Sequence, residues 1–194
     1  LDRWEIAMHA TIDGRVRSPL FLHVRLQVGD VLLAHDSYLV LGQIVHRRIA
    51  LSDPGIDDSR NDFLWSPASP VLIDVFLELR DSDGSIIDQV RSYTALREVA
   101  TQGDRVILNG RAYRLRMVLD QGYWPDGLYT PPSDEAMKFD LETAKRLGFN
   151  MVRKHVKVEP QRFYYHCDKL GILVWQDMPS AVTKQAGEWQ SQFE

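Results

Sequence analysis

The sequence predicts a mixed fold in which an antiparallel β-sandwich is followed by a short run of parallel strands that alternate with helices. Two observations predict it. In about the first hundred residues, apolar and polar side chains alternate with a period of two, which is typical of strands that bury one face. After about Gly103, amphipathic helical patterns alternate with short apolar runs, and such a β-α-β-α-β order requires parallel strands joined by crossovers.

Within the first half, the clearest strand pattern lies in residues 20–28, where every even position is aliphatic. Residues 71–79 repeat the alternation, and the turn-forming residues 81–85 predict a hairpin with a partner strand at residues 86–93. The polar residues 52–61, which include a proline and a glycine, are expected to form a loop. Further strands are expected from Trp4 to His9 and from Tyr38 to Leu51.

The second half begins with a tight hairpin. Asn109-Gly110 lies between the short segments 106–108 and 111–113, and this dipeptide favours a two-residue turn between paired strands. A further strand is expected from Arg114 to Leu119. A helix is predicted to begin after Ser133, whose hydroxyl can cap it, and to end at Gly148. Its expected buried stripe is Met137, Leu141, Ala144 and Leu147.

A second strand and helix repeat this arrangement. Residues 149–152 are a short apolar strand, and Glu159-Pro160 begins the second helix, since proline is tolerated in a first turn. Gly171 ends that helix, and residues 172–175 form the next strand. The expected buried stripe of the helix is Phe163, Tyr164, Cys167 and Leu170. The pattern fits either a small three-stranded α/β layer or an incomplete (β/α) barrel, because a complete barrel takes roughly 250 residues.

The composition narrows the classes of function. The chain has 194 residues, of which 44% are hydrophobic and 26% charged, as is ordinary for a globular protein. Its formal charge of −4, with Lys and Arg spread along the chain, gives no basic footprint, so we expect no nucleic acid and no membrane as partner. No run approaches the roughly 18 apolar residues of a membrane-spanning helix.

The amino terminus and the cysteine count leave the cellular location open. The sequence begins at Leu1 and already has strand character, so we interpret the amino terminus as trimmed and assign no location. The single Cys167 excludes an internal disulfide and a multi-cysteine metal site. Histidines 9, 23, 35 and 46 follow strand alternation without ligand spacing, so neither a metal site nor another cofactor is predicted.

Several segments resemble one known family. Residues 148–155, with the sequence Gly-Phe-Asn-Met-Val-Arg-Lys-His, and residues 163–179, with Cys-Asp-Lys-Leu-Gly before an apolar strand, are similar to the opening of its barrel. Leu64-Trp65-Ser66-Pro67 with Pro70 resembles its W-S-P-x-x-P signature, residues 93–98 its sandwich-to-barrel junction, and residues 108–110 the hairpin that leads into the barrel. The family is glycoside hydrolase family 2, which includes β-galactosidases, β-glucuronidases and β-mannosidases.

The resemblance implies a fold and a domain division. Residues 1–101 would form an immunoglobulin-like β-sandwich, and residues 102–194 the amino-terminal part of a (β/α)8 TIM barrel, truncated after about three strands. In the family's usual layout a sugar-binding jelly roll precedes the sandwich, and it has no counterpart in this sequence.

The resemblance also implies a function, the hydrolysis of O-glycosyl bonds with retention of configuration, in carbohydrate metabolism. Family members use two glutamates, an acid/base after an asparagine at the end of strand 4 and a nucleophile at the end of strand 7. Neither strand is expected in this chain, and no Asn-Glu pair occurs in it. Glu159, Glu188 and Glu194 match neither position. The chain is therefore expected to contain no catalytic residue and to be inactive alone.

The sequence departs from the β-galactosidase branch at two places. The R-x-S-H pattern of that branch is replaced by Arg153-Lys154-His155-Val156, and residues 120–127 are unlike its histidine-rich loop. Its sugar specificity and its magnesium site are therefore not carried over to this chain.

Candidate substrate-binding residues follow from the barrel geometry, because residues at the carboxyl ends of barrel strands face the active site. The chain turns polar at three such ends, and carboxylates, amides and aromatic rings suit sugar hydroxyls and pyranose faces. The candidates are Asp120, Trp124, Arg153, His155, Gln176 and Asp177. A plainer interpretation is that Arg153 and Asp177 pair and only brace the barrel. His166, Cys167 and Trp65 are expected to serve packing.

Two other functions stay open. The sandwich could be the working part of a non-catalytic carbohydrate-binding or interaction module, or the chain could come from a different (β/α)-barrel hydrolase. The residues that follow Glu194 in the parent gene discriminate between these readings. The expected partner of the parent enzyme is a carbohydrate substrate. The unpaired edge after the third strand predicts self-association of the chain or disorder beyond Pro179.

Overall fold

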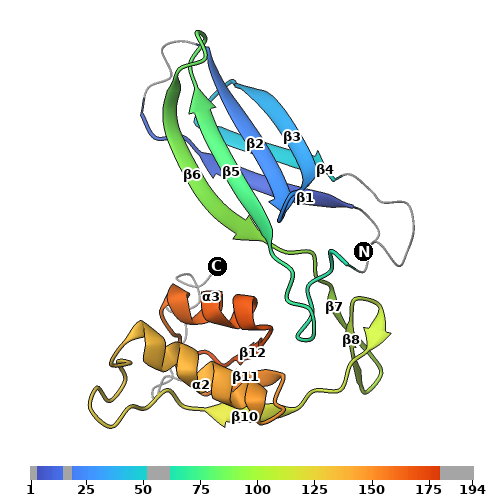
Figure 1. Ribbon diagram of the computed structural model, residues 1–194, viewed down its shortest axis with the longest axis vertical. Helices are drawn as coiled ribbons and strands as arrows, with labels where there is room; N and C mark the ends of the chain where they lie inside the picture. The colour runs from blue at the N-terminus through green and yellow to red at the C-terminus, as the bar shows by residue number, and fades with distance from the viewer. Residues whose placement is uncertain (1–3, 15–18, 52–61, 180–194) are drawn as a thin grey trace, which may run out of the picture. The chain divides into compact units, whose positions relative to one another are not determined.

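The computed structural model describes residues 4–14, 19–51 and 62–179, and Figure 1 shows how their strands and helices are arranged. The chain divides into two compact units, Leu1–Tyr113 and Arg114–Glu194. The fold is mixed and mostly β, with antiparallel sheets in the first unit and a small parallel β/α segment in the second. The predicted domain boundary, between residues 101 and 102, falls before the Asn109-Gly110 hairpin, whereas the compact units part after it.

Parts of the sequence-based predictions lie outside the described residues. These are the loop at residues 52–61, the glutamates 188 and 194, and the proposed disorder beyond Pro179.

The strands of the first unit form two main antiparallel sheets, with β1 and β4 crossing behind the four-stranded sheet (Figure 1). The four-stranded sheet has the order β3 (Val31–Val40), β2 (Leu20–Val28), β5 (Ile73–Arg80), β6 (Ile86–Thr94). The two-stranded sheet pairs β1 (Glu5–Thr11) with β4 (Ile44–Ala50).

One apolar core lies between these two sheets. The even positions of β2 from Leu20 to Leu26 are buried in it, together with Ile73 of β5. Val45 and Ile49 of β4 reach the same core from the other sheet, and Ile6 of β1 packs against it. The period of two in the sequence therefore does mark strands that bury one face.

The run from residue 38 to 51 was predicted as a single strand, and this is wrong. It contains the end of β3 and the whole of β4, and residues 41–43 between them carry the chain from one sheet to the other. The apolar character continues through the turn because Leu41 and Ile44 are apolar yet exposed to solvent. The start of β3, which follows a turn at Gly29, was not predicted either.

A small third sheet completes the first unit, with the order β7 (Val99–Gln102), β8 (Arg105–Leu108), β9 (Arg111–Ala112). Asn109 and Gly110 both have positive φ, 51° and 74°, as a two-residue hairpin turn requires. The Asn109 side chain accepts a hydrogen bond from Glu98 N at 3.0 Å and donates one to Trp65 O at 3.0 Å. Trp65 is buried beneath the Arg97 guanidinium, so its predicted packing role is confirmed.

The second unit alternates strands and helices as predicted, and its strands are parallel. The sheet order is β10 (Met117–Asp120), β11 (Met151–Lys154), β12 (Leu173–Gln176), with α2 (Asp134–Arg146) and α3 (Gln161–Leu170) in the crossovers. Ser133 caps α2, because its hydroxyl accepts from Ala136 N at 3.2 Å. Pro160 is the residue before α3 rather than its first helical residue.

The two faces of the parallel sheet differ. Even-numbered side chains such as Val118, Val152 and Val174 pack against the helices, whose buried residues include Leu141 and Phe163. On the odd-numbered face, Met117, Leu119 and Trp175 are exposed, although Met151 is buried. Neither helix in the described part of the chain is long and apolar enough to cross a membrane.

Most of the predicted helix stripes are found at the sheet. Met137 and Leu141 of α2 are buried, but Leu147 is exposed because it is the C-cap, where the chain leaves the helix. Cys167 of α3 is buried, and this burial raises the pKa of its thiol far above the ordinary value, so it is expected to be unreactive in the folded chain. His166 is also buried, with Nε2 2.9 Å from Asp134 Oδ1.

Two isoleucines on β4 test the core between the two antiparallel sheets. Ile49 is 1% exposed and Ile44 is 61% exposed, so Ile49→Ala should lower the free energy of unfolding of the first unit by about 2–5 kcal/mol. Ile44→Ala should change it by less than about 0.5 kcal/mol. Urea unfolding followed by circular dichroism measures both. Equal effects from the two variants would contradict the assigned core.

Candidate functional site

The three parallel strands end at one edge of the sheet. Asp120, Lys154 and Gln176 are register partners across β10, β11 and β12. The pairing extends one residue further, since His155 N donates to Asp120 O at 3.0 Å and Asp177 N donates to Lys154 O at 3.1 Å. All the candidate residues except Trp124 therefore lie within one residue of this edge.

The exposed side of the edge carries an ion pair between Arg153 and Asp177. Arg153 Nε and Nη2 both lie 3.0 Å from Asp177 Oδ2. Both nitrogens contact the same oxygen, whereas a bidentate pair would use both carboxylate oxygens. Leu119 and Trp175, the register partners of Arg153, are also exposed on this face.

His155 lies beside Gln121 at the same edge. Gln121 Nε2 is 3.3 Å from His155 Nδ1, within hydrogen-bond distance. The next residue, Val156, has a φ of 49°. A β-branched residue in this left-handed region is strained, at a cost on the order of 1–3 kcal/mol.

On the helix side of the edge, four charged residues form a cluster, called the buried cluster below: Asp120, Lys154, Lys157 and Glu159. Three of them are buried, and the Asp120 side chain is 30% exposed. Lys154 Nζ contacts Asp120 Oδ2 at 2.9 Å and Glu159 Oε1 at 2.5 Å, and the Lys154 and Glu159 side chains are 1% and 3% exposed. Lys157 Nζ contacts Glu159 Oε1 at 2.9 Å and donates to Gly122 O at 2.9 Å. Two positive and two negative charges balance, which makes their burial tolerable.

The sequence reasoning missed this cluster, although the strand alternation contained its signal. Lys154 is two residues after the buried Val152, so a strand places both side chains on the same face. A fully buried lysine is rare without a charged partner. The partner Glu159 comes from the loop after the strand, and strand alternation says nothing about where a loop places its side chains.

Two neutral side chains, those of Tyr164 and Gln176, lie next to the cluster. The Tyr164 hydroxyl accepts from Glu159 N at 3.0 Å and donates to Gln176 Oε1 at 2.6 Å, and burial raises its pKa. Gln176 Nε2 donates to Lys157 O at 2.7 Å and to Asp177 O at 2.6 Å. The polar atoms of Gln176 are thus engaged within the chain.

Asp120 is engaged in the same way. Its Oδ1 accepts from Gly122 N at 2.7 Å and its Oδ2 from Lys154. Gly122 has a φ of 66°, and a Cβ added there would lie 2.6 Å from Glu159 Oε1. Only glycine therefore lets this loop lie directly on the cluster. For Asp120 and Gln176, contact with substrate stays a prediction.

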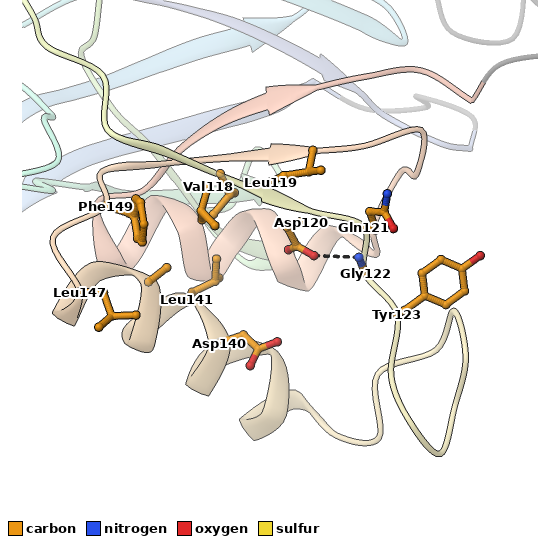
Figure 2. A pocket seen from close by; sticks show the side chains of 12 residues that line it. Val118, Leu119, Asp120, Gln121, Gly122, Tyr123, Asp140, Leu141, Leu147 and Phe149 are labelled. Carbon is orange, nitrogen blue, oxygen red and sulfur yellow. Dashed lines mark hydrogen bonds between the residues drawn. The ribbon is translucent and has the colours of Figure 1, made fainter.

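A cavity of about 390 Å³ lies between β10 and α2, with Tyr123 at one end and Leu147 and Phe149 at the other (Figure 2). Leu119 points to the opposite side of β10. Asp140 lines the cavity, and desolvation, with a smaller effect of the Asp120 charge, raises the pKa of its carboxyl.

Trp124 is the candidate that lies away from the strand ends. It packs against the apolar core on the helix side, and its backbone exchanges two hydrogen bonds with Leu128, at 2.8 and 3.0 Å. It is therefore not grouped with the Arg153–Asp177 pair, and its contact with substrate stays a prediction.

Similarity to known proteins extends over most of the chain. No protein-family profile matches the sequence. A β-galactosidase from Oenococcus oeni is 27% identical over 176 residues, which are 90% of this chain and 17% of that protein. The crystal structure of a Bacteroides uniformis β-glucuronidase has a TM-score of 0.75 and 25% identity over 93% of this chain and 22% of its own. A glycosyl hydrolase family 2 member from Bacteroides cellulosilyticus has a TM-score of 0.72 and 21% identity over 90% of this chain and 24% of its own.

Over most of its length, the chain is related to glycoside hydrolase family 2. The resemblance to this family is thereby confirmed. The chain spans between 17% and 24% of the length of these proteins.

Replacing Lys154, the central lysine of the buried cluster, tests how much the cluster contributes to the stability of the second unit. Lys154→Met leaves the Asp120 and Glu159 carboxylates without their shared cation, so it should destabilise the second unit by about 3–5 kcal/mol. Urea-dependent exposure of the Cys167 thiol, measured with a thiol reagent, reports on this unit.

Lys138→Met is the matched control. Lys138 is 51% exposed and pairs with Glu142 along α2 at 3.3 Å, so the substitution should cost less than about 1 kcal/mol. Wild-type stability in Lys154→Met would contradict the account of the cluster.

Proposed function

We propose that the chain is part of a retaining glycoside hydrolase, to which it contributes an immunoglobulin-like sandwich and the first strands of a (β/α) barrel. The observation that carries the proposal is the similarity to a β-galactosidase over 90% of this chain. The chain itself would supply substrate-binding and bracing residues, and the parent protein the two catalytic glutamates.

Features of the second unit support the barrel in this proposal. In a closed barrel every strand pairs on both sides. Among the described residues, β10 and β12 each pair on one side only, with β11 between them. The cavity beside β10 and the exposed apolar side chains of the odd-numbered face are surfaces that further strands and helices of a barrel would cover.

The carboxyl edge supports the location of the substrate. On the odd-numbered face, which would line the barrel interior, the Arg153–Asp177 pair lies next to Trp175 in the strand order. A guanidinium and a carboxylate can hold sugar hydroxyls, and an indole ring can stack on a pyranose face. In a retaining enzyme the two catalytic carboxyl groups stand about 5–5.5 Å apart, and one forms a covalent glycosyl-enzyme intermediate.

The gene sequence and an activity assay test the function together. We expect an Asn-Glu pair encoded after Glu194, hydrolysis of a nitrophenyl β-glycoside by the full-length gene product, and no hydrolysis by the purified 194-residue chain. The reason is that the two carboxylates act as a unit, so a chain without them has no turnover. The panel is the β-galactoside, the β-glucuronide and the β-mannoside.

Either of two results would reject the proposal. Turnover by the 194-residue chain would place the chemistry on residues that we assign to binding. A full-length product that binds oligosaccharides and cleaves none of the panel would favour the non-catalytic carbohydrate-binding module.

Substitution of Asp177 in the full-length enzyme distinguishes a residue that contacts substrate from one that only braces Arg153. If it holds a sugar hydroxyl more tightly in the transition state, Asp177→Asn should lower kcat/KM by about 10²-fold and leave the melting temperature nearly unchanged. A residue that only braces Arg153 would give lower stability with kcat near normal. Glu142→Gln, an exposed carboxylate change on α2, is the control and should alter neither.

A further inference from the structure

The loop after β11 is held in a conformation that its sequence does not favour. Val156 has a φ of 49°, and it is the one β-branched residue with positive φ in the part of the chain that the structure describes. It directly follows His155, which lies beside Gln121 at the carboxyl edge. Strained backbone of this kind persists only where the surroundings over-determine it.

The contacts of the buried cluster hold Val156 in this conformation. Lys154 and Lys157 lie on either side of Val156, and both ammonium groups contact the same atom, Glu159 Oε1. In an extended chain, residues three apart point to opposite faces. For both lysines to reach one oxygen, the chain has to turn between them, and the left-handed Val156 makes this turn.

Hydrogen bonds from uncharged side chains hold the part of the same loop that follows Val156. Gln176 Nε2 donates to Lys157 O at 2.7 Å, and the Tyr164 hydroxyl accepts from Glu159 N at 3.0 Å. The loop is thus tied to β12 and to α3 after Val156, and to β10 before it through the contact between Lys154 and Asp120.

The cluster is also not arranged for the greatest stability. Glu159 Oε1 receives both ammonium groups, whereas Glu159 Oε2 is buried with no hydrogen-bond partner among the described residues. A buried, unsatisfied carboxylate oxygen opposes folding, and buried ion pairs contribute little net stability. A role in fixing geometry accounts for this arrangement better than a role in stability.

We infer that Glu159 is a positioning residue, which through Lys154 and Lys157 holds Val156 in the left-handed conformation and so fixes His155 at the carboxyl edge. The inference deepens the proposed function, and it rests on that function only in assigning the substrate to this edge. The placement of His155 itself is independent of any activity.

Four variants of the 194-residue chain test the placement: Glu159→Gln, Val156→Gly, the double variant, and Glu142→Gln as an exposed control. The readout is the nuclear Overhauser contact between the His155 ring and the Gln121 side-chain amide, with His155→Gln used to assign the ring signals. Protection of the Cys167 thiol reports separately whether the second unit is folded.

We expect Glu159→Gln to lose the contact because Val156 relaxes, and Glu142→Gln to keep it. Val156→Gly should keep it too, since glycine adopts positive φ without strain. In the double variant glycine can adopt the turn without strain although the cluster is broken, so the contact should return. A merely structural role of Glu159 predicts no such rescue.

Each contrary result overturns the inference. Retention of the contact in Glu159→Gln shows that the cluster does not place His155. Its loss without recovery in the double variant shows that Val156 does not transmit the effect. If Glu159→Gln unfolds the second unit and exposes Cys167, the inference is tested on the double variant alone. The inference then requires that the double variant restores both the protection of the thiol and the contact of His155 with Gln121.

The full-length enzyme gives the functional arm. Glu159→Gln should lower kcat by about 10- to 100-fold, as for a displaced contact residue, with recovery in the double variant. Unchanged kcat alongside a lost contact would mean that the position of His155 does not matter for turnover. An inactive wild-type product would reject the proposed function and leave the His155 result standing.

Discussion

An ammonium group buried between a sheet and its helices needs counter-charges within hydrogen-bond distance. In the second unit, this requirement of Lys154 determines the positions of the residues that contact it. Asp120 has to meet it from the neighbouring strand and Glu159 from the following loop. Glu159 also pairs with Lys157. The loop at Gly122 lies so close to these charged groups that a side chain at residue 122 would not fit. The ends of β10 and β11 and the start of α3 are therefore fixed by one set of charges.

Strand alternation then divides the carboxyl edge into two sides with different properties. On the helix side, the polar atoms of Asp120 and Gln176 are satisfied within the chain. On the open side, Arg153 and Asp177 pair among exposed apolar side chains. A polar residue at a strand end is thus compatible both with holding the scaffold together and with contacting a ligand. The parity of its position indicates only which side of the edge it faces.

The sequence predicted those parts of the fold that depend on neighbouring residues. The alternation in β2, the turn at Asn109-Gly110 and the Ser133 cap are local signals, and each is found in the structure. The division between β3 and β4 was missed because an apolar run continues through the turn, so hydrophobicity did not mark it. The buried cluster was missed for a different reason. Its members are charged, and only the tertiary fold brings Glu159 to Lys154.

The order of strands also bears on how the chain is made. β2 pairs with β5, so that Phe21 lies opposite Arg80, whereas each parallel strand of the second unit pairs with the next one along the chain. During synthesis, β2 and β3 emerge as a hairpin, and the other edge of β2 stays unpaired until β5 arrives. A ribosome that pauses between these strands would display a nascent chain suited to chaperone capture, while a pause later, inside the second unit, would leave both antiparallel sheets complete behind it.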